Sequence, residues 1–251
     1  FIMIIKDDIF VEILNIAFSA GTSILEAKRK IIEINYKNDK SPVTNADRIA
    51  NEIITKKLNI LTPKIYVVSE ENKNNTLIKN ETFWIVDPLD GTKEFIKGSD
   101  EFTVNIALIK NTKPVFGLIY APSKNLTYFT KNANSYRLLG NNSEKKIETA
   151  KNKPYYKTAL MSNSHYNKNT TEYIKKNEIP FIKKVGSSLK FCLIADGEGD
   201  IYPRFGRTME WDTAAGQAIV EAAGGKVELL NGKPLTYGKK SFINPSFICK
   251  S

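Results

Sequence analysis

The stretch Trp84-Ile-Val-Asp-Pro-Leu-Asp-Gly-Thr-Lys-Glu-Phe95 carries the strongest local signal in this chain of 251 residues. Its apolar start, Trp84 to Val86, predicts a buried strand that delivers Asp87 at its carboxyl end. Pro88 fixes its own φ, so we expect the chain to turn there. Because Asp90 follows Asp87 by three residues, both carboxylates can face one point across the turn.

The residues inside this turn are of the kind that hold a cation and an anion together. The carbonyl of Leu89 lies between the two carboxylates, and Gly91 lets the backbone approach a ligand without a Cβ atom. Thr92 can open a short helix whose free N–H groups hold an anion. Two carboxylates, a carbonyl and a helix start suit Mg²⁺ carrying a phosphate. Asp-Gly is also the commonest hairpin pair, so a plain turn is the alternative reading of this stretch alone.

Three further stretches offer site residues, each with a purely structural alternative. Val67-Val-Ser-Glu-Glu71 predicts a second strand that ends in Glu70 and Glu71, at a carboxyl edge where α/β proteins place ligands, although exposed acidic strand ends are common. Asp212 is predicted at a helix start, where N-capping is the commoner use of an aspartate. Gly186-Ser-Ser188 precedes another helix and offers N–H groups and hydroxyls to an anion, or forms an ordinary cap.

Composition excludes several classes of protein and of site. The chain carries 37 Lys+Arg against 27 Asp+Glu, a formal net charge of +10, and is 41% hydrophobic, which indicates a globular protein. Only five of the basic residues are Arg, the residue preferred for phosphate and base contacts, so a nucleic-acid surface is disfavoured against a solvated lysine surface. Cys192, Cys249 and the lone His165 predict neither a disulfide framework nor a zinc site.

The cysteine content and the apolar segments also predict the cellular location of the protein. Two widely spaced cysteines indicate a reducing, cytoplasmic setting. The longest apolar run, residues 1–5, is too short to cross a bilayer or to form a signal peptide core, so no transmembrane segment is expected. The segment 6–28 is read as a core-facing amphipathic helix, with peripheral association at the inner face of the membrane as the alternative.

Hydrophobic periodicity predicts a single α/β domain with two lobes, at about 1–140 and about 141–251, that meet near 135–155. In the first lobe a helix is predicted over 6–28, and the capping-box pattern at Thr44–Asp47 predicts a second that runs to Leu58. Short strands are predicted at 66–69 and 83–87, and an antiparallel meander is expected from strands at 102–109, 115–120, 126–130 and 136–139. The second lobe is expected to contain strands at 158–161, 181–184, 200–203 and 226–229. These alternate with helices at 170–177, 188–196 and 211–223.

Taken together, the motifs resemble a known family. Glu70-Glu71, Asp87-Pro-Leu-Asp-Gly-Thr92 and Trp211-Asp-Thr-Ala-Ala-Gly216 occur in the order and spacing of the magnesium-dependent, lithium-sensitive phosphatases related to inositol monophosphatase. The resemblance covers nearly the whole chain. Within that superfamily, three stretches are similar to the 3'(2'),5'-bisphosphate nucleotidases of bacterial sulfate assimilation: Lys93-Glu-Phe95, Gly186-Ser-Ser-Leu-Lys-Phe191 and Tyr202-Pro-Arg204.

The resemblance implies a layered α/β/α/β/α sandwich and hydrolysis of adenosine 3',5'-bisphosphate to AMP and phosphate, with 3'-phosphoadenylyl sulfate as a further substrate. It also implies two or three Mg²⁺ ions in each site. The first ion is expected on Glu70, Asp87 and the Leu89 carbonyl. The second is expected on Asp87, Asp90 and Asp212, with Asp87 bridging.

Catalytic and substrate-binding roles follow from the same resemblance. Asp47, Glu70 and Thr92 are expected to orient and deprotonate the attacking water, while Gly91 and Thr92 contact the scissile phosphate. The rest of the substrate is expected against the metal ligands Glu70, Leu89, Asp90 and Asp212 and the turn residues Gly186, Ser187 and Ser188. Lys190 and Arg204 are candidates for a second phosphate, with surface solvation as the alternative.

Two other functions stay open on the sequence. The first is a related phosphatase acting on inositol or sugar phosphates. The second is a basic nucleic-acid-binding protein, which the intact carboxylate set and the scarcity of Arg disfavour. The expected partner is therefore a small nucleotide rather than a nucleic acid polymer, and the expected assembly is a monomer or homodimer.

Overall fold

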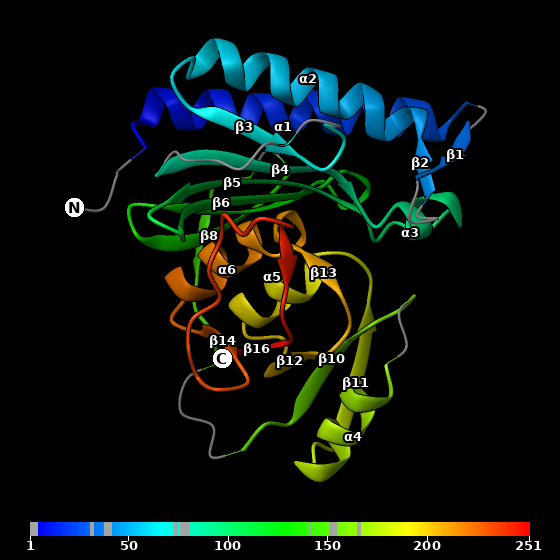
Figure 1. Ribbon diagram of the computed structural model, residues 1–251, viewed down its shortest axis with the longest axis vertical. Helices are drawn as coiled ribbons and strands as arrows, with labels where there is room; N and C mark the ends of the chain where they lie inside the picture. The colour runs from blue at the N-terminus through cyan, green and yellow to red at the C-terminus, as the bar shows by residue number, and fades with distance from the viewer. Residues whose placement is uncertain are drawn as a thin grey trace.

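The computed structural model describes residues 5–30, 33–37, 42–72, 75, 81–140, 142–150, 155–164 and 167–251. Helices and sheets alternate in five layers, with two helices outermost, then a seven-stranded sheet, two further helices, a five-stranded sheet and a last helix (Figure 1). This arrangement confirms the predicted α/β/α/β/α sandwich.

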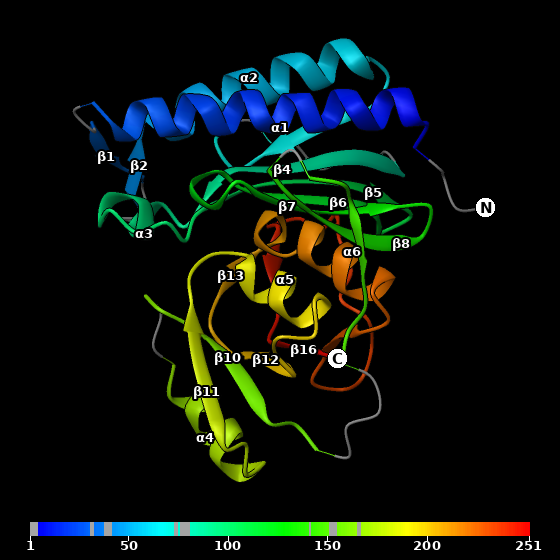
Figure 2. The same cartoon turned by 180° about the vertical axis from the view of Figure 1, so that it is seen from behind.

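The first layer consists of α1 (Asp7–Lys28) and α2 (Asn45–Leu61), which lie side by side on one face of the larger sheet (Figure 2). α1 is long and apolar enough, by length and composition alone, to cross a membrane. Its buried face includes Phe10, Ile13 and Ile24, which belong to one hydrophobic cluster with α2 and the sheet. The prediction of a core-facing helix is therefore confirmed.

The larger sheet has the strand order β3-β4-β5-β6-β7-β8-β9. Its first two strands are parallel and the remaining neighbours are antiparallel. The antiparallel meander predicted from residue 102 to about 139 is therefore confirmed. The strands are β3 (Tyr66–Ser69), β4 (Thr82–Asp90), β5 (Thr103–Lys110), β6 (Lys113–Ala121), β7 (Leu126–Lys131), β8 (Asn134–Leu139) and β9 (Lys145–Ile147). The shorter elements around it are the hairpin β1 (Ile34–Tyr36) and β2 (Pro42–Thr44), the helix α3 (Thr92–Ile96) and a 3₁₀ turn at Pro122–Lys124.

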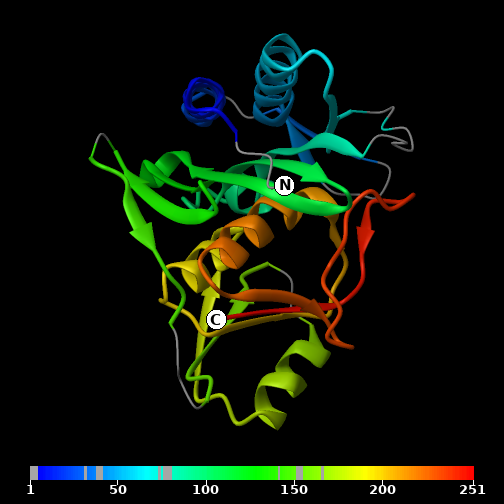
Figure 3. The ribbon, with the colours of Figure 1, turned by 90° about the vertical axis from the view of Figure 1, so that its left-hand side faces the viewer.

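The smaller sheet is mixed and has the order β11-β10-β12-β16-β14. Its strands are β10 (Thr158–Ser162), β11 (Phe181–Val185), β12 (Ile201–Arg204), β14 (Lys226–Leu229) and β16 (Phe247–Lys250). A separate pair is formed by β13 (Thr208–Met209) and β15 (Ile243–Asn244). Between the two sheets lie α5 (Leu189–Ala195) and α6 (Ala214–Ala222), and α4 (Lys168–Lys176) covers the outer face (Figure 3).

Small residues bring the inner helices close to their neighbours. A Cβ atom at Gly216 of α6 would lie 2.3 Å from Cγ of Phe191 in α5, and one at Gly117 of β6 would lie 2.3 Å from the carbonyl oxygen of Ala215. The glycines are therefore required by close packing of α6 on α5 and on the larger sheet.

The structure differs from the prediction at the strand that decides the fold. β4 does not end at Asp87 but continues to Asp90, and Asp87 pairs with Asn105 while Asp90 pairs with Thr103. Between these pairs, two residues on β4, Pro88 and Leu89, therefore oppose one on β5, Val104, which is a β-bulge. In a regular strand, residues three apart point to opposite faces, and the extra residue removes that offset. The bulge, rather than a turn, is what allows the two carboxylates to share a face.

Other differences are smaller. The predicted helix over 211–223 is a 3₁₀ turn at Glu210–Asp212 followed by α6. The short strands β1, β2, β9, β13, β15 and β16 were not predicted, and β16 pairs with both β12 and β14 inside the smaller sheet.

Candidate active site

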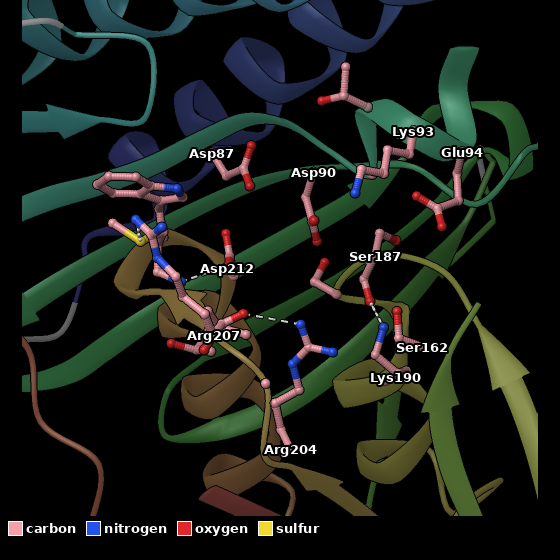
Figure 4. A pocket seen from close by; sticks show the side chains of 18 of the residues that line it. Asp87, Asp90, Lys93, Glu94, Ser162, Ser187, Lys190, Arg204, Arg207 and Asp212 are labelled. Carbon is pink, nitrogen blue, oxygen red and sulfur yellow. Dashed lines mark hydrogen bonds between the residues drawn. The ribbon is translucent and has the colours of Figure 1, made fainter. Parts of the chain in front are cut away.

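A pocket of about 450 Å³ opens where the carboxyl ends of β3 and β4 meet the start of α5 and the segment from β12 to α6. It is lined by residues from both sheets (Figure 4). The predicted site residues among them are Glu70, Asp87, Leu89, Asp90, Gly91, Thr92, Ser187, Ser188, Lys190, Arg204 and Asp212. The structure thus brings together side chains that lie up to 142 positions apart in the sequence, counted from Glu70 to Asp212.

Three carboxylates converge at one end of the pocket. Each of Glu70, Asp87 and Asp212 has an oxygen within 4.8 Å of the others. Burial raises the pKa of Asp87 and of Asp212 well above the usual range, and the neighbouring acidic groups raise both further. Like charges so close in a buried place need a counter-ion. A set made only of carboxylate oxygens fits a hard divalent cation such as Mg²⁺.

Asp212 reaches this cluster without capping α6. Its Oδ2 accepts the backbone N–H of Met209 at 2.8 Å, within the 3₁₀ turn that precedes the helix. The helix itself begins at Ala214 with Thr213 as the N-cap residue, and no side chain caps it. Asp212 is therefore not the N-cap residue of α6, but its carboxylate does accept the N–H of the residue that caps the preceding 3₁₀ turn.

Asp90 lies in the same pocket but outside the group of three. Its carboxylate accepts the backbone N–H of Ser188, and Nδ2 of Asn105 lies 3.5 Å from Oδ2. Burial raises the pKa of Asp90 to about 6, against the opposing attraction of Lys190. Figure 4 shows Asp87, Asp90 and Asp212 around one part of the pocket. Asp90 as a ligand of a second ion stays a prediction.

Asp47 and Thr92 form a hydrogen-bonded pair beside the carboxylates. The Oγ1 of Thr92 lies 3.1 Å from Oδ1 of Asp47 and 3.2 Å from the Leu89 carbonyl oxygen. The other oxygen of Asp47 accepts the backbone N–H and the hydroxyl of Thr44, in the predicted capping box. Burial raises the pKa of Asp47, and hydrogen bonds from Thr44 and Thr92 oppose that rise. One side chain thus starts α2 and holds Thr92 in place.

Lys37 is a site residue that the sequence did not reveal. Its Nζ lies 2.6 Å from Oε1 of Glu70 and 2.6 Å from Oε1 of Glu71. Burial lowers the pKa of Lys37, but its attraction to the two carboxylates outweighs that effect, so the net shift is upward. Lys37 lies in a Lys- and Asn-rich stretch, where the pattern does not distinguish it from its neighbours.

Cationic and neutral donors line the opposite end of the pocket. Lys190 and Arg204 are 4% and 9% exposed, so the surface-solvation alternative for both is wrong. Lys190 donates from Nζ to the carbonyl oxygens of Val185 at 3.1 Å and Ser187 at 2.5 Å. Burial lowers the pKa of Lys190 to about 8, and Asp90 opposes that fall.

Several of these donors are buried without a protein partner. In the part of the chain that the structure describes, Nε of Arg204, Nε1 of Trp211 and Oγ of Ser187 are buried and unpaired. Buried donors in native proteins normally have a partner, and an unpaired one costs about 1–3 kcal/mol. Three such atoms in one pocket indicate that a ligand supplies the acceptors. His165 lies outside the described residues.

The sequence model of the Inositol monophosphatase family matches residues 7–250. The chain belongs to the inositol monophosphatase family. The resemblance predicted from the three motifs is therefore confirmed, and the protein is a phosphatase of this family. Members of the family depend on metal ions, which agrees with the acidic cluster in the pocket.

Individual relatives narrow the comparison. The 3'(2'),5'-bisphosphate nucleotidase CysQ of Buchnera aphidicola is 45% identical over 243 residues, which are 94% of this chain and 91% of the relative. The protein of the same name from Escherichia coli K12 is 41% identical over 241 residues, 94% of this chain and 97% of the relative. The crystal structure of CysQ from Bacteroides thetaiotaomicron superposes with a TM-score of 0.83 at 39% identity, covering 96% of each chain.

Proposed function

We propose that this family member hydrolyses the 3'-phosphate of adenosine 3',5'-bisphosphate to give AMP and phosphate, with 3'-phosphoadenylyl sulfate as a second substrate. The observation that carries the proposal is the pairing, in one pocket, of three converging carboxylates with buried donors that lack partners. The first group suits a metal-bound reacting phosphate, and the second suits another anionic group on the same molecule. The names of the relatives from Buchnera and Escherichia coli support the same substrate class.

We assign the metal to the carboxylate end of the pocket. Glu70, Asp87 and the Leu89 carbonyl would hold one Mg²⁺, and Asp87, Asp90 and Asp212 would hold a second. When bound, Mg²⁺ neutralises phosphate charge, lowers the pKa of a water and stabilises the leaving oxygen. The carboxylates keep this end of the pocket nearly neutral once the cations are present, so a phosphate dianion can enter.

Asp47 and Thr92 act on the proton of the attacking water. Asp47 holds Thr92 through its Oδ1, which turns the threonine oxygen into an acceptor for the proton of the water. The raised pKa of Asp47 makes its carboxylate a better base than an exposed aspartate. Gly91 and Thr92 would contact the scissile phosphate, and Glu70 would help to orient the water.

Lys190 and Arg204 would bind the second phosphate. Lys190 uses two of its three donors on backbone carbonyls, so one is free for an anion. Arg204 uses Nη2 on the carbonyl of Arg207 and has Nε unpaired. Ser187 and Ser188 line the same end of the pocket, whereas Gly186, which precedes them in the turn, is not among the lining residues.

One substrate panel tests the proposal. Phosphate release is measured with Mg²⁺, with and without Li⁺, from adenosine 3',5'-bisphosphate, 3'-phosphoadenylyl sulfate, adenosine 3'-monophosphate and inositol monophosphate. We expect the bisphosphate to be preferred, Li⁺ to inhibit, and Lys190→Ala and Arg204→Ala each to raise KM for the bisphosphate more than for the monophosphate. Preference for inositol monophosphate would refute the proposal. Equal effects of the two variants on both substrates would remove Lys190 and Arg204 from the specificity role.

The proposal has consequences for setting and partners. We propose a cytoplasmic enzyme, monomeric or homodimeric, that binds a small nucleotide and no nucleic acid polymer. Steep salt-dependent binding of DNA or RNA, measured by fluorescence anisotropy, would contradict the last point.

A further inference from the structure

The turn at Gly186–Ser188 is tied across the pocket by a carboxylate that lies outside the proposed metal-binding set. The Oε2 of Glu101 accepts the backbone N–H of Gly186 at 2.8 Å and Nδ2 of Asn163 at 2.5 Å. Glu101 lies just before β5 of the larger sheet, whereas Asn163 and Gly186 follow β10 and β11 of the smaller sheet. A single oxygen atom thus joins the two sheets beside the pocket.

The contact leaves no space for a side chain at Gly186. A Cβ atom there would lie 2.9 Å from each of three atoms, Cβ and the carbonyl oxygen of Glu101 and Cγ of Glu94. The short distance between the Gly186 N–H and the Glu101 carboxylate therefore depends on glycine. The Glu101 carboxylate and the Gly186 backbone are packed as one unit.

The next residue, Ser187, is held in an unfavourable conformation. Its φ is 48°, in the left-handed region that serine rarely adopts, and such a residue costs about 1–3 kcal/mol unless its surroundings fix it. Its carbonyl oxygen accepts from Lys190 Nζ, as the dashed line in Figure 4 shows. Ser187 lines the pocket, and its buried Oγ has no partner in the described part of the chain.

We propose that Glu101 is a positioning residue that acts through Ser187. By holding the N–H of Gly186, Glu101 keeps Ser187 in the left-handed conformation in which its hydroxyl is free to donate to the substrate's second anionic group. This inference rests on the proposed function for the identity of that group. The N–H of Gly186 and Nδ2 of Asn163 both donate to the same oxygen of Glu101. A single well-placed acceptor oxygen therefore fulfils the positioning role, and the negative charge of the carboxylate is not required.

A matched pair of variants separates position from charge. Glu101→Gln keeps an oxygen at the same distance from the backbone but loses the charge, whereas Glu101→Asp keeps the charge but is one methylene shorter. We expect Glu101→Asp to raise KM for adenosine 3',5'-bisphosphate about tenfold, as the loss of a hydrogen bond to a charged group predicts, with kcat changed by less than about twofold. Glu101→Gln should retain most of the affinity. The opposite order would show a role of charge and overturn the proposal.

A double-mutant cycle tests whether Glu101 acts through Ser187. Ser187→Ala should raise KM by a similar factor, and adding Glu101→Asp to Ser187→Ala should cause little further change. Additive effects, or equal losses for the bisphosphate and for adenosine 3'-monophosphate with a lower melting temperature, would mean a merely structural role. The control is Glu198→Ala, which removes a half-exposed glutamate paired at 3.4 Å with Lys183 of β11 and should leave KM unchanged.

The proposed function and the positioning role of Glu101 can be refuted independently of each other. If the wild-type enzyme does not hydrolyse the bisphosphate, the proposed function is refuted. The cycle is then measured on a substrate that carries two phosphates and that the enzyme does hydrolyse, such as an inositol bisphosphate, where non-additivity supports the coupling of Glu101 to Ser187 and additivity refutes it.

Discussion

The ion pairs of Lys37 lead to a quantitative prediction about metal binding. Lys37 lies 2.6 Å from Glu70, a proposed metal ligand, so its ammonium group competes with the metal for the same carboxylate. Replacing it by methionine, which has a similar length and no charge, removes that competitor. We therefore expect Lys37→Met to bind divalent metal more tightly than the wild-type protein.

The size of the effect follows from the exposure of the pair. The side chains of Lys37 and Glu70 are 25% and 26% exposed, so solvent screens their attraction partially. Partly exposed pairs contribute up to about 1 kcal/mol, which corresponds to roughly a fivefold change in affinity. Part of that gain is lost if Lys37 keeps its contact with Glu71 when the metal binds, so fivefold is the upper expectation.

The metal affinity of Lys37→Met is measured in two ways. One is Mn²⁺ binding, detected by electron paramagnetic resonance, and the other is the Mg²⁺ concentration that gives half-maximal activity. The control is Lys64→Met, which removes the same charge from an exposed position just before β3. Metal binding in Lys37→Met that is unchanged or weaker than in the control would refute the competition and indicate that Lys37 instead orients Glu70 for the metal.

Three further predictions concern turnover, pH and packing. Asp90→Asn should lower kcat by about 100-fold or more, while its circular dichroism spectrum shows an intact fold. Near wild-type phosphate release by this variant would refute Asp90 as a metal ligand. The pKa of Asp90 is raised from 3.8 to about 6, so the metal-free folded protein binds a proton that the unfolded chain releases. This contribution to stability is complete below pH 3.8 and is lost as the pH rises through about 6. The melting temperature of the metal-free protein should therefore fall across that window, less steeply in Asp90→Asn. Gly216→Ala should lower the free energy of unfolding by about 2 kcal/mol in urea titrations, because its Cβ would overlap Phe191. Gly206→Ala, where the nearest atom is 3.6 Å away, is the control and should be nearly neutral.

Much of the fold could be predicted because its signals are local. The helix predicted over 6–28 is observed at Asp7–Lys28, since apolar residues at helical spacing decide it within one segment. β16 was missed because its four residues, Phe247–Lys250, carry no periodic signal, and only their pairing with β12 and β14 makes them a strand. The end of β4 was misplaced for a similar reason. Pro88 indicates a turn locally, but the pairing of Asp90 with Thr103 extends the strand through a bulge.

Some residues of the candidate site could likewise be predicted from the sequence and others could not. Motif residues such as Asp87 and Asp212 could be named because their residue types and spacing are distinctive. Lys37 and Glu101 could not, because each acquires its role from a partner 33 or 85 positions away. A lysine in a lysine-rich chain and a glutamate before a strand have no pattern that marks them.

By itself the sequence determined the chemical class of the site. With two cysteines and one histidine in the chain, carboxylates are the available metal ligands, and hard oxygen ligands favour Mg²⁺. The tertiary structure alone decided which carboxylates converge, bringing Glu70, Asp87 and Asp212 within 4.8 Å and turning Asp90 toward Ser188. The physical reason is that these distances depend on a β-bulge and on the packing of two sheets around α5 and α6, and no local preference of the chain encodes either.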